Sequence, residues 1–223
     1  MGLATNDSAA PNPRIKIRIE TLSDLVFGLA LSIGSLVLIG RVPQSGQDLA
    51  TNILLFGFGF LVIIMIWLGY SRTMSALPGE VPSALYANLG LLFCVALAPY
   101  LFYVLQSTPS VDVLNAGSIA YGFDVGVMFL LLAALARLVI KEDEKARMSG
   151  HSLVHPVVVR RFGRIMKAEV AVGLIFAVSA LPVFWVSTPV GILRFAMWYF
   201  SPLIFGIARI YGRLDNRTRE RKA

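Results

Sequence analysis

Long apolar segments alternate with short polar breaks along this chain of 223 residues. The apolar segments are about 20 residues long, which is the length that an α-helix needs to cross the hydrocarbon core of a bilayer. Proline, glycine and serine gather between the segments, where they interrupt helices. The pattern therefore predicts an all-α integral membrane protein. The six predicted membrane spans are 18–40, 49–71, 83–106, 113–140, 167–188 and 191–212.

The first span has an unusual distribution of polar residues. It carries no charge from Leu25 to Gly40, yet Arg18, Ser23 and Asp24 stand in its first turns. A charge at membrane depth costs about 2.5–3.5 kcal/mol on insertion scales, so charges kept there usually have partners. We therefore expect a structural polar network that joins these three residues, within one helix or between adjacent helices. The alternative is an ordinary helix start, in which Ser23 or Asp24 is the N-cap.

An apolar stripe runs along the same span. Leu29, Ile33 and Leu36 recur at spacings of four and three residues, which places them on one face of an α-helix. A neighbouring face carries small residues, which allow another helix to approach closely. Judged from the residues alone, such a stripe is more often helix-packing core than the lining of a pore. The small residues are Gly28, Ser32 and Ser35.

Composition and charge support a membrane protein and suggest its orientation. The chain is 57% hydrophobic with a mean hydropathy of +0.73, which is too apolar for one soluble domain. Of its 20 lysines and arginines, only Arg41 and Arg194 fall on the side of the membrane opposite the termini. Basic residues concentrate on the cytoplasmic side. We therefore expect a multi-pass protein of the cell membrane with both termini in the cytoplasm. Nucleic-acid binding is the weaker explanation of the net charge.

The predicted membrane domain is flanked by short tails and interrupted by one sizeable loop, whose first part, Lys141 to Met148, should continue the fourth helix as a charged, exposed stretch. His151 and His155 lie in that loop, where they could bind a metal or sense pH. No cysteine or carboxylate pattern surrounds them, so solvated loop histidines are the favoured interpretation. The predicted units are a cytoplasmic tail (1–16), a six-helix transmembrane domain (17–213) with a cytoplasmic loop (141–163), and a basic cytoplasmic tail (214–223).

Two motifs resemble a known family. Residues 18–24 read Arg-x-x-x-Leu-Ser-Asp, and residues 27–32 follow as Phe-Gly-Leu-Ala-Leu-Ser. They are similar to the first-helix signature of the transmembrane protein 175 family of potassium channels, Arg-x-x-x-Phe-Ser-Asp and then Phe-Ala-Ile-Ala-x-Thr-Leu-Leu. Residues 88–99, Asn-x-x-Leu-x-Phe-x-x-x-Leu-x-Pro, are similar to the third span of that family. The departures from the first-helix pattern are Leu22, Leu25, Gly28, Leu29, Ser32 and Gly34.

The resemblance implies a homotetramer in which the first helices surround a central pore that has no carbonyl-type filter. It also implies that the Arg-Ser-Asp group is a structural network that holds the helices. Ser32 takes the position of a threonine that can contact ions. The pore constriction carried over by position consists of Leu29, Ile33 and Leu36.

The resemblance, together with the predicted spans, implies a potassium-permeable cation channel that conducts potassium ions passively across the lipid bilayer without a cofactor. An enzyme is not expected, because the spans contain no catalytic triad, carboxylate pair or metal cluster. The alternative is a proton-coupled carrier that uses Asp24 and Asp124. Asp124 could also be a buried anchor that hydrogen-bonds another helix, which is the favoured interpretation of that residue. A non-conducting membrane scaffold is a third, weaker possibility.

Overall fold

The computed structural model describes residues 13–40, 42–77, 81–107, 110–150, 155–188 and 191–220. Helices dominate, and a two-stranded antiparallel hairpin pairs Ser187 with Ile192 and Thr188 with Gly191. The elements are α1 (Pro13–Ile39), α2 (Gly46–Ala76), α3 (Pro82–Ser107), α4 (Val111–Met148), α5 (Pro156–Ser179), the 3-10 helix η1 (Pro182–Phe184), β1 (Ser187–Thr188), β2 (Gly191–Ile192) and α6 (Leu193–Glu220).

In the part of the chain that the structure describes, four helical segments are long and apolar enough to cross a membrane: Ile17–Leu36 in α1, and the whole of α2, α3 and α4. The prediction of an all-α, multi-pass membrane protein is thereby confirmed. Among the described residues, α5 and α6 contain no stretch that is both long enough and apolar enough, although Leu193–Ala208 forms a shorter apolar stretch. The fifth and sixth spans therefore stay predictions.

Several helices extend beyond the predicted boundaries. The first helix begins at Pro13, inside the predicted N-terminal tail, and α6 continues to Glu220, inside the predicted C-terminal tail. The fifth helix runs over Pro156–Ser179 rather than 167–188. Proline at its first position favours an early start, and the chain has left the α-helix before Pro182, which begins η1.

The described part of the predicted loop 141–163 is largely helical, and its first residues continue the fourth helix as expected. The fourth helix continues to Met148. Two ion pairs between residues one turn apart support its charged end. The Nζ atom of Lys145 lies 2.6 Å from Oε1 of Glu142, and the Nε atom of Arg147 lies 2.7 Å from Oδ2 of Asp143. His155 precedes α5, and its ring nitrogen accepts a hydrogen bond from the backbone of the new helix. His155 is thus an exposed helix cap, whereas His151 lies outside the described residues.

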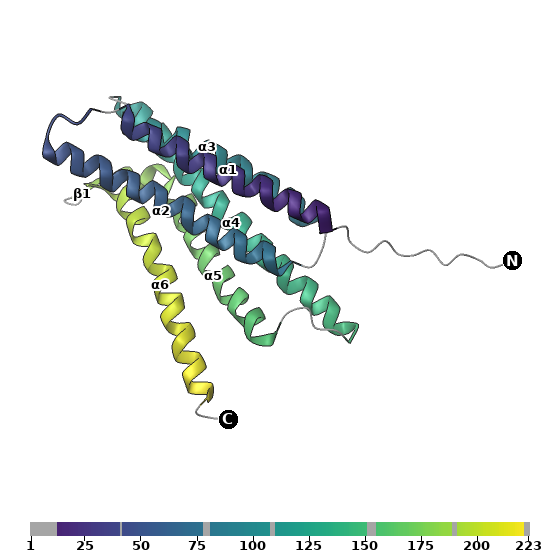
Figure 1. The fold of residues 1–223 in the computed structure, drawn as a ribbon. Coiled ribbons are helices and arrows are strands. Elements are labelled where there is room, and N and C mark those ends of the chain that lie inside the picture. The colour runs from purple at the N-terminus through teal and green to yellow at the C-terminus, as the bar shows by residue number, and fades with distance from the viewer. Residues whose placement is uncertain are drawn as a thin grey trace.

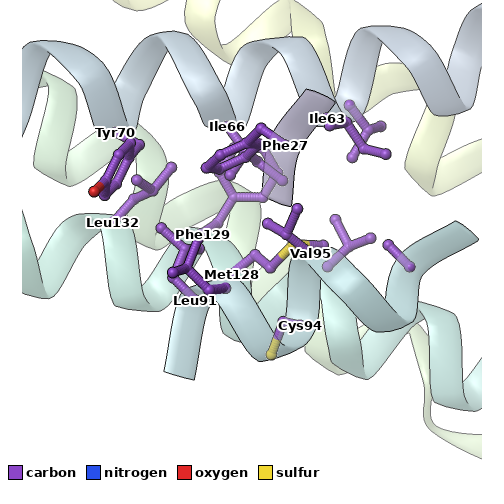
Figure 2. Packing of buried hydrophobic residues seen from close by; sticks show 14 of the residues in the cluster. Phe27, Ile63, Ile66, Tyr70, Leu91, Cys94, Val95, Met128, Phe129 and Leu132 are labelled. Carbon is purple, nitrogen blue, oxygen red and sulfur yellow. The ribbon is translucent and has the colours of Figure 1, made fainter. Parts of the chain in front are cut away.

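The helices pack as one bundle, with α1 alongside α3 and with α6 diverging from the rest toward its C-terminal end (Figure 1). Aromatic and aliphatic side chains of several helices interlock in the core, among them Phe27 of α1, Ile66 of α2, Leu91 of α3 and Phe129 of α4 (Figure 2). The bundle therefore buries only one side of α1.

Glycines allow α4 and α5 to pack backbone to backbone. A Cβ atom added at Gly126 of α4 would lie 3.0 Å from the carbonyl oxygen of Gly173 in α5. A Cβ atom at Gly173 would lie equally close to the carbonyl oxygen of Gly126. Small residues at such crossings are typical of membrane helices, because close packing replaces the hydrophobic effect as a source of association energy.

Candidate pore-lining helix

Two buried residues fix which face of α1 points into the bundle. Phe27 is 1% exposed and Ala30 is 2% exposed, and both belong to the core cluster. The ring of Phe27 lies 5.6 Å, centroid to centroid, from the ring of Tyr70 in α2. Because successive residues of a helix are separated by about 100°, this anchoring fixes the direction of every other side chain of α1.

The opposite face of α1 is a continuous apolar stripe, which we call the α1 stripe. Its five large side chains are between 49% and 59% exposed. The structure thus brings the three predicted constriction residues onto one exposed face. Large exposed apolar patches of this kind mark interaction surfaces or lipid contacts. The α1 stripe consists of Leu22, Leu25, Leu29, Ile33 and Leu36.

Small residues beside the α1 stripe leave room for another helix. A Cβ atom added at Gly28 or Gly34 would meet nothing within 4 Å. Ser32, which is exposed, donates a hydrogen bond to the carbonyl oxygen of Gly28 at 2.9 Å, and Ser35 donates to that of Ser32 at 2.7 Å. Both hydroxyl protons are therefore satisfied within the helix, while the hydroxyl oxygens keep accepting capacity.

Ser23 is the centre of a buried hydrogen-bond cluster that joins three helices. Its side chain is 0% exposed, and its hydroxyl donates to the carbonyl oxygen of Ile19 at 2.8 Å. It accepts a hydrogen bond from the hydroxyl of Tyr70 in α2 at 2.7 Å and one from the amide of Asn88 in α3 at 3.4 Å. We call Ser23, Tyr70 and Asn88 the Ser23 cluster. A satisfied cluster without formal charge can be buried at little cost.

Asp24 and Arg18 lie outside the Ser23 cluster. Asp24 is exposed, and its carboxylate accepts a hydrogen bond from the indole nitrogen of Trp67 in α2 at 3.0 Å. Arg18 is exposed, and no ion pair joins it to Asp24 among the described residues of one chain. The structure therefore does not bring the three predicted network residues together. Consecutive residues of a helix cannot share a face, which explains why Ser23 points inward and Asp24 does not.

Sequence reasoning missed Tyr70 and Trp67, because their partners on α1 are distant in sequence. The arrangement could have been suspected from helix spacing, since a tyrosine and a tryptophan three residues apart share one face of α2. Together with Ser23 and Asp24, they tie the first turns of α1 to α2.

A second buried cluster, centred on Arg194, was also missed. This arginine at the start of α6 is 0% exposed. It donates to the carbonyl oxygen of Ser179 at 2.7 Å, to the side-chain oxygen of Asn115 at 2.8 Å and to the hydroxyl of Ser118. Its guanidinium lies 5.1 Å from the ring centroid of Trp185. We call these residues the Arg194 cluster. It joins the start of α4, the end of α5 and the start of α6.

Asp124 is a buried residue of α4 and makes no contact with Asp24. It is 5% exposed, and its carboxyl group lies near the thiol of Cys94 in α3. Its Oδ2 atom has no hydrogen-bond partner among the described residues. Asp24 instead contacts Trp67 on another helix. The two aspartates named for a carrier therefore occupy separate environments.

Part of the chain matches a known protein family. Residues 18–99 match the family model described as the endosomal/lysosomal potassium channel TMEM175, which confirms the resemblance seen in the first helix. This segment contains the α1 stripe and all residues of the Ser23 cluster. No curated protein matches the chain.

Two crystal structures share the fold. One is of a lysosomal potassium-selective channel TMEM175 homolog from Chamaesiphon minutus, with 19% identity and a TM-score of 0.58, covering 91% of this chain and 98% of that chain. The other is of a variant of the potassium channel MtTMEM175 in complex with a Nanobody-MBP fusion protein, with 17% identity and a TM-score of 0.56, covering 98% of this chain and 100% of that chain. The likeness therefore extends beyond residue 99 into α4, α5 and α6.

Proposed function

We propose that the protein is a potassium-permeable cation channel in which the α1 helices of four copies surround a central pore. The observation that carries this proposal is the α1 stripe: a row of large apolar side chains that one chain leaves exposed, in the segment that matches the family model. In this proposal each chain contributes its α1 stripe, and four such stripes around a four-fold axis form the wall of the pore.

Repetition of α1 about the pore axis turns Leu29, Ile33 and Leu36 into three stacked apolar rings. A narrow apolar ring offers nothing that replaces the hydration shell of an ion, so it blocks conduction when it loses water. Ser32 lies within this stretch, and the lone pairs of its hydroxyl oxygen can coordinate a cation. Ring diameter, the Ser32 hydroxyl and the hydration that an ion keeps would then set the preference for potassium over sodium.

The Ser23 cluster supports the pore by fixing the rotation of α1. Its hydrogen bonds hold α1 to α2 and α3, and the contact between Asp24 and Trp67 adds a second tie to α2. The α1 stripe keeps its outward direction as long as these ties hold. In this proposal six spans form one channel domain over residues 17–213, and both termini are cytoplasmic.

Leu29→Ser tests the assignment of the pore. Replacing a ring of leucines by small hydroxyl side chains admits water, so potassium flux into vesicles that contain the purified protein should rise and the preference over sodium should fall. Leu174→Ser is the matched control, since Leu174 of α5 is 50% exposed and Leu29 is 53% exposed. If both variants conduct like the wild type with unchanged selectivity, α1 does not line the pore.

One observation supports the alternative function of a proton-coupled carrier: the Oδ2 atom of the buried Asp124 has no hydrogen-bond partner among the described residues. Recordings from reconstituted single proteins distinguish the two functions. A channel gives unitary currents that follow the electrochemical gradient, whereas a carrier gives slow flux driven by a pH gradient. Unitary currents that persist without a pH gradient would exclude the carrier.

A further inference from the structure

A large cavity lies on the side of the bundle away from α1. It has a volume of about 610 Å³ and is lined by residues of α2, α4, α5 and α6. Pockets that hold small organic molecules commonly measure about 300–1,000 Å³, so this cavity is large enough for part of a lipid. Figure 1 shows how α6 diverges from the bundle toward its C-terminal end. The apolar wall includes Met65, Leu68, Phe129, Leu132 and Phe205.

Three arginines from two helices line the same cavity. Arg72 comes from the last turns of α2, and Arg161 and Arg164 come from the first turns of α5. Arg161 and Arg164 are three residues apart, so they project from the same face of the helix. The cavity therefore has a strongly positive end, and its apolar wall continues from there toward the middle of the bundle.

Glu169 is the only acidic side chain among the described lining residues. Glu169 lies five residues beyond Arg164, which corresponds to about 7.5 Å along the helix. It is 2% exposed, and its Oε2 atom has no hydrogen-bond partner among the described residues. A carboxyl group at this depth disfavours an anion deeper in the cavity than the arginines. The cavity thus favours a negative group at the arginine end alone.

We propose that this cavity binds an anionic phospholipid, with the phosphate at Arg72, Arg161 and Arg164 and one acyl chain along the apolar wall. Guanidinium groups bind phosphate oxygens through paired hydrogen bonds. The order of the lining, with cations at the end of the helices and apolar side chains deeper, matches the order of headgroup and acyl chain in one leaflet. The site is separate from the α1 stripe and does not depend on ion conduction.

Binding to the purified full-length protein in a neutral detergent tests the proposal. Native mass spectrometry counts bound lipid while phosphatidylglycerol, phosphatidylcholine or inorganic phosphate is titrated. Phosphatidylglycerol should bind, phosphatidylcholine should bind more weakly, and inorganic phosphate should not compete. Competition by inorganic phosphate would show a site for free phosphate and overturn the lipid proposal. Equal binding of the two lipids would overturn it as well, because the arginines would then play no part.

Two matched pairs of variants locate the site. Arg161→Gln should weaken phosphatidylglycerol binding by about fivefold, the effect expected of one arginine near a lipid phosphate. Arg160→Gln is its control, because Arg160 is the adjacent exposed arginine and does not line the cavity.

Gly206→Leu should fill the cavity from α6 without a clash, since an added Cβ atom meets nothing within 4 Å. Gly163→Leu, at an equally open position outside the cavity, should leave binding unchanged.

The remaining outcomes contradict the proposal. Equal losses for Arg161→Gln and Arg160→Gln would indicate attraction to the basic surface in general. Wild-type binding in Gly206→Leu would place the lipid elsewhere on the protein. If the wild type binds no lipid and Gly206→Leu disrupts the oligomer while Gly163→Leu does not, the cavity is occupied by a second copy of the chain.

Discussion

Removing the side chain of Arg194 should destabilise the protein more than removing any exposed arginine. The guanidinium ties together the start of α4, the end of α5 and the start of α6 through hydrogen bonds to Asn115, Ser118 and Ser179. It also donates to the carbonyl oxygens of Ala180 and Leu181, at 3.3 and 3.2 Å. Arg194→Met keeps most of the volume but donates none of these bonds.

The magnitude follows from the acceptors that are left behind. A buried acceptor without a partner costs about 1–3 kcal/mol, and Arg194→Met strands the acceptors of Asn115, Ser118 and Ser179. The cation also faces the last carbonyls of α5, where a positive charge contributes up to about 2 kcal/mol in partly buried geometries. Replacing the guanidinium also removes the cost of burying its charge, and this gain offsets several kcal/mol of the loss. The net expectation is a decrease of about 3 kcal/mol in the free energy of unfolding.

Unfolding of the purified protein by sodium dodecyl sulfate in mixed micelles, followed by circular dichroism, measures this change. Arg194→Lys should fall between the wild type and Arg194→Met, because an ammonium keeps the charge but cannot reproduce the planar fork of a guanidinium. Arg137→Met on the exposed face of α4 is the control and should stay within about 0.5 kcal/mol of the wild type. An Arg194→Met protein as stable as this control would refute the role assigned to the Arg194 cluster.

Three further predictions address other parts of the bundle. Tyr70→Phe removes the donor to Ser23 and should lower the free energy of unfolding by about 1 kcal/mol in the same assay; an unchanged value would count against the Ser23 cluster. Asp124→Asn should leave potassium flux intact with and without a pH gradient, and loss of flux would instead favour the carrier. Gly126→Val places a Cβ atom 3.0 Å from a backbone oxygen of α5 and should lower the free energy of unfolding by about 1–3 kcal/mol. The control Gly163→Val, in open space, should leave it unchanged, and equal effects of the two substitutions would argue against tight packing of α4 on α5.

The sequence was most informative where a property repeats along a helix. The positions of Leu29, Ile33 and Leu36 on one face follow from the period of the α-helix alone. That this face is exposed in one chain could not be derived, because a core-facing stripe has the same spacing. The structure decides the matter through Phe27 and Ala30, which take the inward face instead.

Contacts between helices were the least predictable features. Ser23 and Asp24 are adjacent in sequence and looked like one network with Arg18, yet their partners are Tyr70 and Trp67 on another helix. Pairing across helices depends on how the helices are rotated against each other, which the spacing within one helix does not specify.

Boundaries and buried charges were harder for a different reason. The early start of α5 is favoured by a proline rather than by apolarity, so hydropathy placed the start of this helix too late. Arg194 was interpreted as one of two external basic residues. Its burial depends on backbone carbonyls at the end of α5, and carbonyl groups leave no signal in the sequence.

Each of the two buried clusters stabilises one half of the bundle. The Ser23 cluster ties α1, α2 and α3, whereas the Arg194 cluster ties α4, α5 and α6. The Ser23 cluster is built from contacts within one chain, so the outward direction of the α1 stripe is set within that chain. In the proposed channel, substitutions on the α1 stripe should therefore alter flux while the free energy of unfolding of the chain stays close to that of the wild type. Substitutions in the Arg194 cluster, which ties α4, α5 and α6 rather than α1, should lower the free energy of unfolding first, and flux should fall only as folded protein is lost.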